Sequence, residues 1–311
     1  MANTLLTPDL IARQALATLY ESMVMLPLVY TDLSTEFTTQ KIGDTVNVRK
    51  PAVFEAKDFD RARGIELQDA VESSIPVKLD KIADVSFAVT TEQLTQEITD
   101  FNTQLLAPAM MALAQKIDRE ILAMRNGITQ QAGLSNQPGV TNPADFAWNK
   151  PEVLIEAGRQ LDVNNVPSDQ RVVITGPTTK AHWLNSPLLK TANQSGTTDA
   201  LRRASLGNGL FGFDAYQTQN VGQPKVSPAV GDPTTEVGLA FHKSALAFTS
   251  APLEVAPGSF AAVETYRGVS IRVAYQYSID KKQTVVSLDT LYGTKVLDPK
   301  RAVLIKGDNH A

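Results

Sequence analysis

Apolar residues recur every three or four positions across residues 90–127, which is the spacing of one buried face of an α-helix. The repeating apolar positions are Leu94, Ile98, Phe101, Leu105, Ala109, Leu113, Ile117, Ile121 and Met124. Thr90 and Gln93 fit a capping box at the start of this helix, and Gly127 fits a C-terminal stop. The pattern predicts a helix of roughly 50 Å, which is longer than a compact domain needs. Pro108 would remove one backbone hydrogen bond near the middle, so we expect a kink there.

A second amphipathic pattern lies near the start of the chain, over residues 7–26. Thr7 is a suitable N-cap, Pro8 suits the first helical position, and Asp9 complements the helix dipole. The apolar stripe consists of Ile11, Ala15, Leu19, Met23 and Leu26. Pro27 is expected to end the helix, because proline disrupts the helical ladder. An amphipathic terminal helix usually docks on its own core, and we expect the same here.

Segments with strand-like composition follow at Thr45–Arg49, Ile75–Leu79 and Val85–Val89. The first two frame a polar run of about twenty-five residues, and loops of this length are usually functional or disordered. Its charged residues include Lys57, Asp58, Asp60, Arg61, Arg63, Glu66, Asp69 and Glu72. We therefore predict a hairpin that projects from the body of the protein and has little core of its own.

Helical and strand patterns are partly segregated in the second half of the chain. Residues 151–162 and a segment that begins at Pro177 predict short helices, residues 171–175 predict a buried strand, and residues 198–205 predict a further helix. The segments that predict the remaining strands are VGLAFH, ALAFTS, GVSIRVAYQYSID, QTVVSLDTLYG and RAVLIKG. This segregation favours an α+β fold over a regular alternation of strands and helices.

Composition narrows the class of protein. The chain has 311 residues, of which 43% are hydrophobic and 20% are charged, as is typical of a folded globular protein. The net charge is −4 and no concentrated basic patch is visible, so tight nucleic-acid binding is disfavoured. The absence of cysteine excludes disulfides and thiolate sites and fits a reducing cytosol.

Membrane contact and secretion are not expected from the sequence. The first residues, MANTLLTPDL, lack the basic region and apolar stretch of a signal peptide. The longest strongly apolar run without a charge covers residues 22–31, and a spanning helix needs about 20 apolar residues. We therefore expect the chain to stay in solution.

The segment LGNGLFGFDAYQTQNV contains Gly207, Gly209 and Gly212 at the spacing of a dinucleotide-binding turn. In such a site the glycines follow a strand and open a helix, whose N-terminus receives the pyrophosphate. Here a helix-like segment precedes the glycines and a strand-like segment follows them, so the order is reversed. A tight structural turn with positive φ is the favoured interpretation, and a nucleotide-binding enzyme is the remote alternative.

Other sequence signals of catalysis are weak. Gly176 and Lys180 fall in a strand–turn–helix segment, but the second glycine and the Ser or Thr of a phosphate loop are missing. The 3 histidines lack metal-site spacing, and no nucleophile elbow occurs. The charged segment 55–81 has few apolar residues that could form the wall of a pocket. We therefore predict no enzyme, no cofactor, no metal site and no catalytic residue.

Three stretches of sequence carry a family resemblance. They are LDVNNVPSDQRVVITGP (161–177), the glycine-rich LGNGLFGFDAYQTQNV, and LAFHKSALAF together with VVSLDTLYGTKVLDPKRAVLI. They resemble the major capsid proteins of tailed bacteriophages, which share the Hong Kong 97-type fold, and most of all the P-twenty-two-like coat family. The order of elements matches over nearly the whole chain. One departure is that the inserted domain of the namesake coat protein has no counterpart here.

The resemblance implies five regions. They are an N-terminal arm (1–35), an extended loop (36–89), a peripheral domain with a spine helix (90–149), an axial domain (150–250) and strands that return to the peripheral domain (251–311). It also implies that the loop contacts neighbouring subunits through Lys57, Asp58, Asp60, Arg61 and Arg63. Exposed ion pairs contribute only ~0–1 kcal/mol each, so these charges would set register more than affinity.

The function implied by the resemblance is that of a major capsid protein, a self-assembling structural protein of the virion. Hexamers and pentamers would close into an icosahedral shell around double-stranded DNA, assembled in the cytoplasm of the bacterial host. The implied partners are further copies of the chain, a separate scaffolding protein and a portal at one vertex, with weak non-specific contact to the packaged DNA. Decoration proteins are left open. The alternative is an encapsulin-type nanocompartment, which shares the fold but encloses cargo enzymes.

Overall fold

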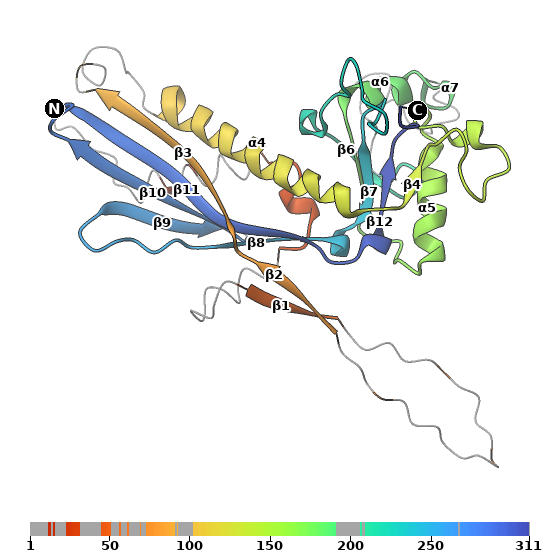
Figure 1. The fold of residues 1–311 in the computed structure, drawn as a ribbon, viewed down its shortest axis with the longest axis horizontal. Helices are drawn as coiled ribbons and strands as arrows, with labels where there is room; N and C mark the ends of the chain where they lie inside the picture. Colours follow the sequence, from red (N-terminus) through yellow and green to blue (C-terminus); the bar gives the residue numbers. More distant parts are fainter. Residues whose placement is uncertain are drawn as a thin grey trace.

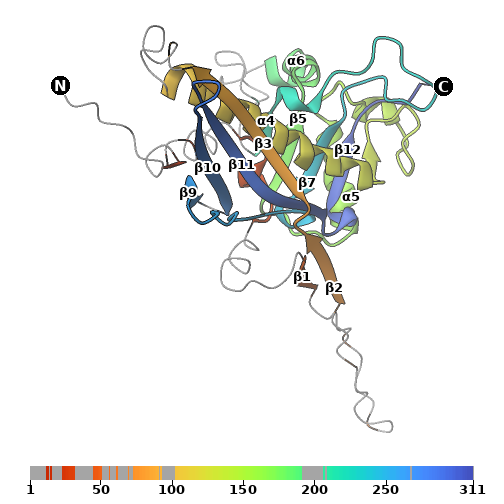
Figure 2. The same ribbon diagram turned by 60° about the vertical axis from the view of Figure 1, so that its left-hand side comes forward.

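Two five-stranded sheets and one long helix form the body of the protein, and a two-stranded hairpin lies beside them (Figure 1). The computed structural model describes residues 12–13, 15, 23–31, 45–50, 56, 61, 69, 73–90, 92, 102–190, 206, 209–266 and 268–310. A view turned by 60° shows the same hairpin projecting from the body (Figure 2). Helices and strands are largely separate along the chain, which confirms the predicted α+β class.

The first sheet is antiparallel throughout and joins strands that are far apart in the sequence. Its order is β3-β11-β10-β9, and β8 pairs with the last part of β11. The strands are β3 (Lys81–Thr90), β8 (Leu246–Ala251), β9 (Phe260–Tyr266), β10 (Val269–Ser278) and β11 (Gln283–Val296). Along β3 exposed side chains alternate with covered ones, as expected for a sheet with one face on a core.

The long helix α4 (Ala107–Ala123) lies across one face of the first sheet (Figure 1). Its apolar stripe is buried in the main core, where Ile117 of the helix and Leu288 of β11 belong to the same cluster. A π-helical turn (Asn102–Leu106) precedes the helix and a 3-10 turn (Met124–Gly127) follows it. Residues 102–127 are therefore helical, as the apolar periodicity predicts.

Pro108 does not lie in the middle of one continuous α-helix, as the sequence predicts, but in the first turn of α4. The hydrogen-bonding pattern changes from π to α directly before it, between Leu106 and Ala107. Proline lacks the N–H that would continue the ladder, and a change of helix type accommodates such an interruption. Thr90, the expected N-cap, is the last residue of β3. Most of residues 91–101 lie outside the described residues, so the capping box and the kink stay predictions.

The second sheet is mixed and lies at the C-terminal end of α4 (Figure 1). Its order is β4-β12-β7-β5-β6, in which β4 and β6 run parallel to their neighbours and the inner pairs are antiparallel. The strands are β4 (Gln131–Ala132), β5 (Arg171–Thr175), β6 (Asp214–Gln217), β7 (Gly238–His242) and β12 (Ala302–Ile305). Every residue of β5, β7 and β12 is buried, because both faces of this sheet are covered.

Short helices surround the second sheet. They are α5 (Val153–Val163), α6 (Pro177–Leu184) and α7 (Pro187–Lys190), of which α7 was not expected from the sequence. Leu154 of α5 and Trp183 of α6 belong to a second core cluster with side chains of the sheet. Short 3-10 turns occupy Leu26–Leu28, Pro143–Phe146, Gln219–Val221, Lys243–Ala245 and Pro299–Arg301.

Strands β1 (Thr45–Lys50) and β2 (Ser73–Lys78) form the predicted hairpin, which projects from the body in both views (Figures 1 and 2). They pair in antiparallel register with Lys50 opposite Ser73. Among their described side chains Val77 is buried, whereas the others are exposed or half-buried. The hairpin therefore has little core of its own, as its polar sequence predicts.

The N-terminal segment docks on the main core. Ala12 and Ala15 are helical and fully buried, and Met23 and Leu26 belong to the same core cluster. This is the behaviour expected of an amphipathic terminal helix. The predicted helix does not extend to Pro27, because Met23, Val24 and Met25 are not helical and Pro27 lies within the separate 3-10 turn Leu26–Leu28.

Four strands differ from the sequence prediction, and one of them is the short β4, in a segment expected to be a loop. β9 was not predicted, and β12, expected to return to the peripheral domain with residues 251–311, pairs instead with β4 and β7 of the second sheet. The chain turns between the sheets at a 3-10 turn, where the Asp298 carboxylate accepts the N–H of Lys300 at 3.0 Å. β8 falls mostly in the range 150–250, which was expected to form the axial domain, but it belongs to the first sheet. It pairs with the part of β11 beyond Asp289, the residue at which the pairing of β11 with β10 ends. The helix predicted at 198–205 lies outside the described residues.

Candidate assembly surface

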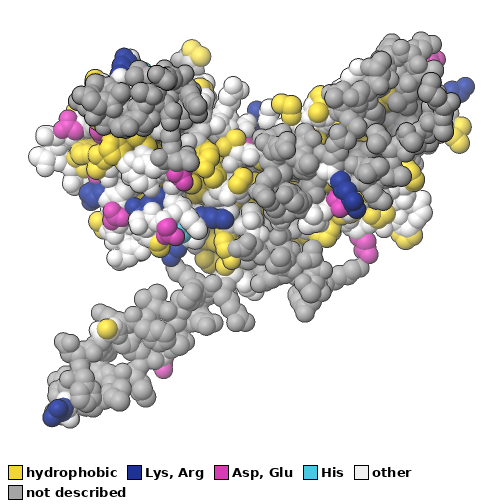
Figure 3. Space-filling model, turned by 180° about the vertical axis from the view of Figure 1, so that it is seen from behind, with side chains coloured by type: hydrophobic (Ala, Val, Ile, Leu, Met, Phe, Trp, Pro, Cys, Tyr) yellow, Lys and Arg dark blue, Asp and Glu magenta, His cyan; other side chains and the backbone are white. Residues whose placement is uncertain are grey.

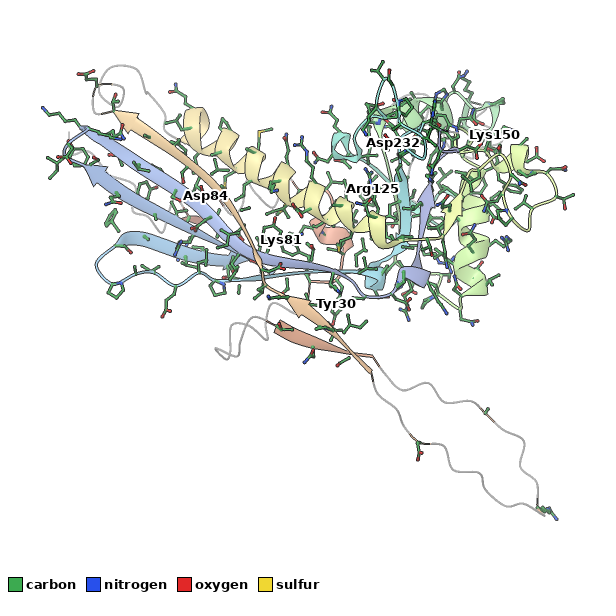
Figure 4. All side chains as sticks on the ribbon, viewed as in Figure 1. Tyr30, Lys81, Asp84, Arg125, Lys150 and Asp232 are labelled. Carbon is green, nitrogen blue, oxygen red and sulfur yellow. The ribbon has the colours of Figure 1, made fainter. Side chains whose placement is uncertain are left out.

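The base of the projecting hairpin rests on a small apolar cluster. Val77 of β2 is buried against Ala247 of β8, and Val48, Tyr30 and Leu297 pack around them. Backbone hydrogen bonds of 3.0 Å join Tyr30 to strand β8 through its N–H and through its carbonyl oxygen. Figure 4 shows Tyr30 beside the base of the hairpin. Because the cluster is small, few contacts determine where the hairpin points.

A close backbone crossing lies where the hairpin leaves the first sheet. A β-carbon on Gly293 of β11 would collide with the carbonyl oxygen of Lys78, the last residue of β2. Only glycine lets the two strands approach so closely. The sequence contains no local signal for this requirement, because Lys78 and Gly293 are far apart along the chain.

Ion pairs tie the start of β3 to α4. Lys81 donates to Glu120 of α4 at 2.6 Å and to the hydroxyl of Thr294 at 3.4 Å (Figure 4). Lys116 donates to the other oxygen of Glu120 at 3.0 Å. The hydrogen bonds from Lys81 and Lys116 lower the pKa of Glu120. This network fixes β3 against the helix just after the hairpin ends.

The face of the first sheet that points away from α4 carries polar side chains. Asp84 accepts hydrogen bonds from Ser287 at 2.9 Å and from Ser86 at 3.0 Å. Further across the sheet, Arg272 binds both oxygens of Asp289 at 3.0 and 2.5 Å. The hydrogen bond to Asp289 raises the pKa of Arg272. One face of the sheet thus belongs to the core, and the other carries these polar pairs together with the exposed Ile82.

Asp118 is a buried carboxylate that joins three parts of the chain. It is 1% exposed and accepts the backbone N–H groups of Val24 at 3.1 Å and Met25 at 3.2 Å. The side chain of Asn220, in the loop after β6, also donates to it. Burial raises the pKa of Asp118, and these hydrogen bonds oppose the rise. The carboxylate therefore connects the N-terminal segment and the second sheet to the long helix.

Arg125 makes a second connection from the end of the same helix. Its Nη1 donates to the carbonyl oxygens of Val221 at 3.0 Å and Val237 at 2.9 Å. Burial lowers the pKa of this guanidinium. Asp118 and Arg125 are about two helical turns apart and so share a face of the helix. Neither residue was predicted from the sequence. An available signal was the charged Asp118 directly beside Ile117, a member of the repeating apolar positions that form the buried face of the helix.

The N-terminus of α6 is filled by a carboxylate of this chain. Glu236 is 2% exposed and accepts the backbone N–H groups of Thr178 at 3.0 Å and Thr179 at 2.8 Å. The side-chain amide of Gln223 also donates to it. Burial raises the pKa of Glu236, but these donors outweigh burial and hold the pKa below its ordinary value. A β-carbon on Gly176 would collide with the carboxylate, so this strand–turn–helix segment receives an internal anion in place of a phosphate.

The glycine-rich segment forms a turn that leads into β6. Gly209 and Gly212 have φ of 79° and 84°, and the N–H of Gly212 donates to the carbonyl of Gly209 at 3.3 Å. The N–H of Gly209 donates to the carboxylate of Asp214, the first residue of β6, at 3.1 Å. A strand follows the turn, so the helix N-terminus that a nucleotide site needs is not formed there. Gly207 lies outside the described residues.

The charged residues expected to contact neighbouring subunits are only partly described. Arg61 is an exposed turn residue, whereas Lys57, Asp58, Asp60 and Arg63 lie outside the described residues. Their role in subunit contacts stays a prediction. On the face seen in Figure 3, described charges of both signs are scattered and do not gather into a patch of one sign.

The histidines of the described region have structural surroundings. His242 accepts the backbone N–H of Ser244 at 3.2 Å through Nδ1 and so caps a short 3-10 turn, and burial lowers its pKa. The ring of His182 meets that of Trp148 edge to face at 5.2 Å. Over the described residues, no cluster of three or more His, Asp or Glu is placed to hold a metal ion.

A surface hollow of about 560 Å³ lies beside His182 and is lined by both charged and apolar side chains. Lys150, labelled in Figure 4, and Glu152 are among them, together with Leu188 of α7. His182 and Ser186 both line it, and the Ser186 hydroxyl oxygen accepts the backbone N–H of Leu188 at 3.4 Å. None of the described helices is long and apolar enough to cross a membrane.

The fold as a whole is similar to those of solved phage structures. One from Mycobacterium phage Che8 is similar with a TM-score of 0.63 at 20% identity, over 91% of this chain and 90% of that chain. The capsid structure of Cyanophage P-SCSP1u is similar with a TM-score of 0.61 at 15% identity, over 86% of this chain and 85% of that chain. The mature capsid of bacteriophage PhiM1 is similar with a TM-score of 0.60 at 10% identity, over 86% of this chain and 83% of that chain. No protein-family profile matches the chain, and no curated protein sequence matches it significantly.

These similarities cover most of each chain, so they concern the whole architecture and not one shared motif. At such low identity they establish the fold alone. The chain has the phage capsid fold, as the sequence resemblance implied.

Proposed function

We propose that this chain is the major capsid protein of a tailed bacteriophage, a structural protein that assembles into an icosahedral shell around double-stranded DNA. The similarity of the whole fold to phage capsid structures carries the proposal. The projecting hairpin supports it, because β1 and β2 have little core of their own within one subunit. The polar outer face of the first sheet offers a surface for neighbouring copies.

The proposed regions are those implied by the family resemblance, although β8 and β12 pair across the boundaries between them. They are the N-terminal arm (1–35), the extended loop (36–89), the peripheral domain with the spine helix (90–149), the axial domain (150–250) and the returning strands (251–311). β9, β10 and β11 continue the peripheral sheet, whereas β12 completes the sheet of the axial domain. Asp118 and Arg125 lie at the junction and would hold the two domains together as one subunit.

Assembly into hexamers and pentamers would add many weak contacts. Exposed ion pairs contribute only ~0–1 kcal/mol each, but a subunit in a closed shell meets several neighbours, and repeated contacts reinforce one another. The charged residues of the extended loop would set the register of these contacts. They are Lys57, Asp58, Asp60, Arg61 and Arg63. The base of the hairpin, with its crossing at Gly293, would direct the loop toward the neighbour.

The proposed partners are further copies of the chain, a scaffolding protein during assembly and a portal at one vertex. The shell would assemble in the cytoplasm of the bacterial host and become part of the virion. The net charge of −4 suits an inner lining that does not hold the packaged DNA tightly. We propose no enzymatic activity, no cofactor and no membrane partner.

Negative-stain electron microscopy of the purified protein, expressed alone and with a co-expressed scaffold, tests the proposal. We expect closed, empty shells of uniform diameter in at least one preparation. Failure to form shells in both would contradict the proposal, and shells that co-purify with protein cargo would favour an encapsulin-type nanocompartment. A thermal shift with NAD tests the remote enzyme hypothesis, because a dinucleotide-binding protein should be stabilised by its ligand.

A further inference from the structure

The proline-rich loop Gly222–Glu236 holds two valine side chains in solvent. Val226 is 103% exposed and Val230 is 80% exposed. Single apolar side chains on a protein surface are common, so exposure alone indicates little. The loop that carries these two is, however, held by hydrogen bonds within itself and to the C-terminal segment.

Contacts within the loop hold its two arms together. Lys225 pairs with Asp232 at 2.8 Å, and the same carboxylate accepts the N–H of Ala229 at 3.1 Å. Pro224 directly precedes Lys225, and Pro228 directly precedes Ala229. Each proline restricts the backbone of the loop further. Val226 and Val230 therefore stand on a preorganised support.

The C-terminal segment holds the loop from outside. The N–H of Gly231 donates to the carbonyl of His310, and the N–H of His310 donates to the carbonyl of Asp232, both at 2.8 Å. The hydroxyl of Thr234 donates to the carbonyl of Asp308 at 2.6 Å. The loop (teal in Figures 1 and 2) lies with the C-terminus near α6, and Figure 4 labels Asp232 there. Ordering a loop costs conformational entropy, yet the ordered loop leaves the side chains of Val226 and Val230 exposed to water.

We infer that the loop is a rigid contact element that places Val226 and Val230 against an adjacent copy of this chain. The inference rests on the proposed function and names one contact through which copies meet. Rigidity favours such a role, because an element already in its bound conformation loses little entropy on binding.

The small apolar area that these two side chains offer argues for a second copy as the partner. Two valine side chains cover far less than the ~1,200–2,000 Å² buried by a stable pairwise interface. Such a contact would not hold an independent partner, but the same contact repeated around a closed ring reinforces itself. The charges of Lys225 and Asp232 are paired with each other, so the loop offers no net attraction to nucleic acid or to an anionic lipid surface.

A pair of matched variants tests the apolar contact. Val226→Thr with Val230→Thr keeps the branched shape but replaces one methyl group of each side chain by a hydroxyl, whereas Val226→Ile with Val230→Ile keeps both side chains apolar. We expect the threonine variant to raise the protein concentration at half-assembly about tenfold or more, measured by light scattering and sedimentation. The isoleucine variant should stay nearer to the wild type. Thermal unfolding of the unassembled subunit should be unchanged in both, and wild-type assembly by the threonine variant would overturn the inference.

A single thiol gives an independent measurement. The chain has no cysteine, so Val226→Cys introduces one labelling site. We expect maleimide to label this thiol freely in unassembled subunits and about tenfold more slowly, or slower still, in shells. A thiol that reacts equally fast in normal shells would overturn this inference alone. Failure of the wild-type protein to form shells would instead contradict the proposed function.

Discussion

The carbonyl oxygen of Lys78 lies where a β-carbon of Gly293 would have to stand. The contact joins the end of β2 to the part of β11 that pairs with β8, so it determines how the hairpin crosses the first sheet. A side chain at position 293 would have to push one of the two strands away, and both are anchored, β2 through Val77 and β11 through its pairing with β3 and β8.

Gly293→Ala should therefore destabilise the subunit and move the hairpin. Overpacking of this kind costs about 1–3 kcal/mol of unfolding free energy, which urea denaturation can measure. Gly158→Ala is the control, because a β-carbon there would meet Phe213 of the second core at an ordinary 3.7 Å. That change should stabilise α5 by about 0.5–1 kcal/mol, since alanine favours helix over glycine. Equal stability of the two variants would contradict the crossing argument.

Glu236→Gln should weaken the start of α6. The variant loses the negative charge that accepts the N–H groups of Thr178 and Thr179, which should lower the free energy of unfolding by about 1–2 kcal/mol at neutral pH. The pKa of Glu236 is lowered in the folded state, so its contribution is present above the ordinary glutamate pKa of about 4.3 and is lost as pH falls through the folded value.

The difference in unfolding free energy between the wild type and Glu236→Gln should therefore shrink on acidification. Asp280→Asn is a suitable control, because Asp280 is an exposed residue in the turn between β10 and β11. It should leave stability nearly unchanged over the same pH range. A difference for Glu236→Gln that is independent of pH would show that its charge is not what caps the helix.

Asp118 should show the opposite dependence on pH. Its pKa is raised in the folded state, so its contribution is fully present below the ordinary aspartate pKa of about 3.9 and is lost as pH rises through the folded value. Asp118→Asn cannot ionise, so the stability of the wild type relative to this variant should fall as pH rises. Urea unfolding at several pH values measures the trend.

Asp118→Ala separates the hydrogen bonds from the charge. It leaves the N–H groups of Val24 and Met25 without their acceptor in a buried place, which should cost about 1–3 kcal/mol. Asp118→Asn retains a side-chain oxygen and should cost less. If both variants were as stable as the wild type, Asp118 would not be the connection between the N-terminal segment and α4.

Charge reversal in the extended loop should impair assembly without unfolding the subunit. Arg61→Glu with Arg63→Glu reverses two charges on a loop that has little core of its own, so thermal unfolding of the subunit should be unchanged. Shell closure, seen by electron microscopy, should be defective because the ion pairs that set register become repulsive. Arg61→Lys with Arg63→Lys keeps the charge and should form shells. Normal shells from the glutamate variant would contradict this role of the loop.

Periodicity and turn chemistry are local properties, and they predicted the elements that local sequence controls. The apolar stripe ending at Met124 predicted the described part of the long helix, and strand β5 begins and ends at the predicted residues. Gly209 and Gly212 were expected to need positive φ, and both have it, because the bend before β6 is a requirement of the backbone itself. The resemblance of ordered segments then pointed to the capsid fold.

The partners of those elements were decided only by the tertiary structure. Nothing near β12 in the sequence shows that it joins the second sheet, because strand pairing depends on which edges are free after the rest of the chain has folded. Asp118, Glu236 and Gly293 were missed for the same reason: each is defined by backbone groups far away in the sequence. A carboxylate becomes a cap, and a glycine becomes indispensable, only when burial brings a distant N–H or carbonyl group against it and removes water as the alternative partner.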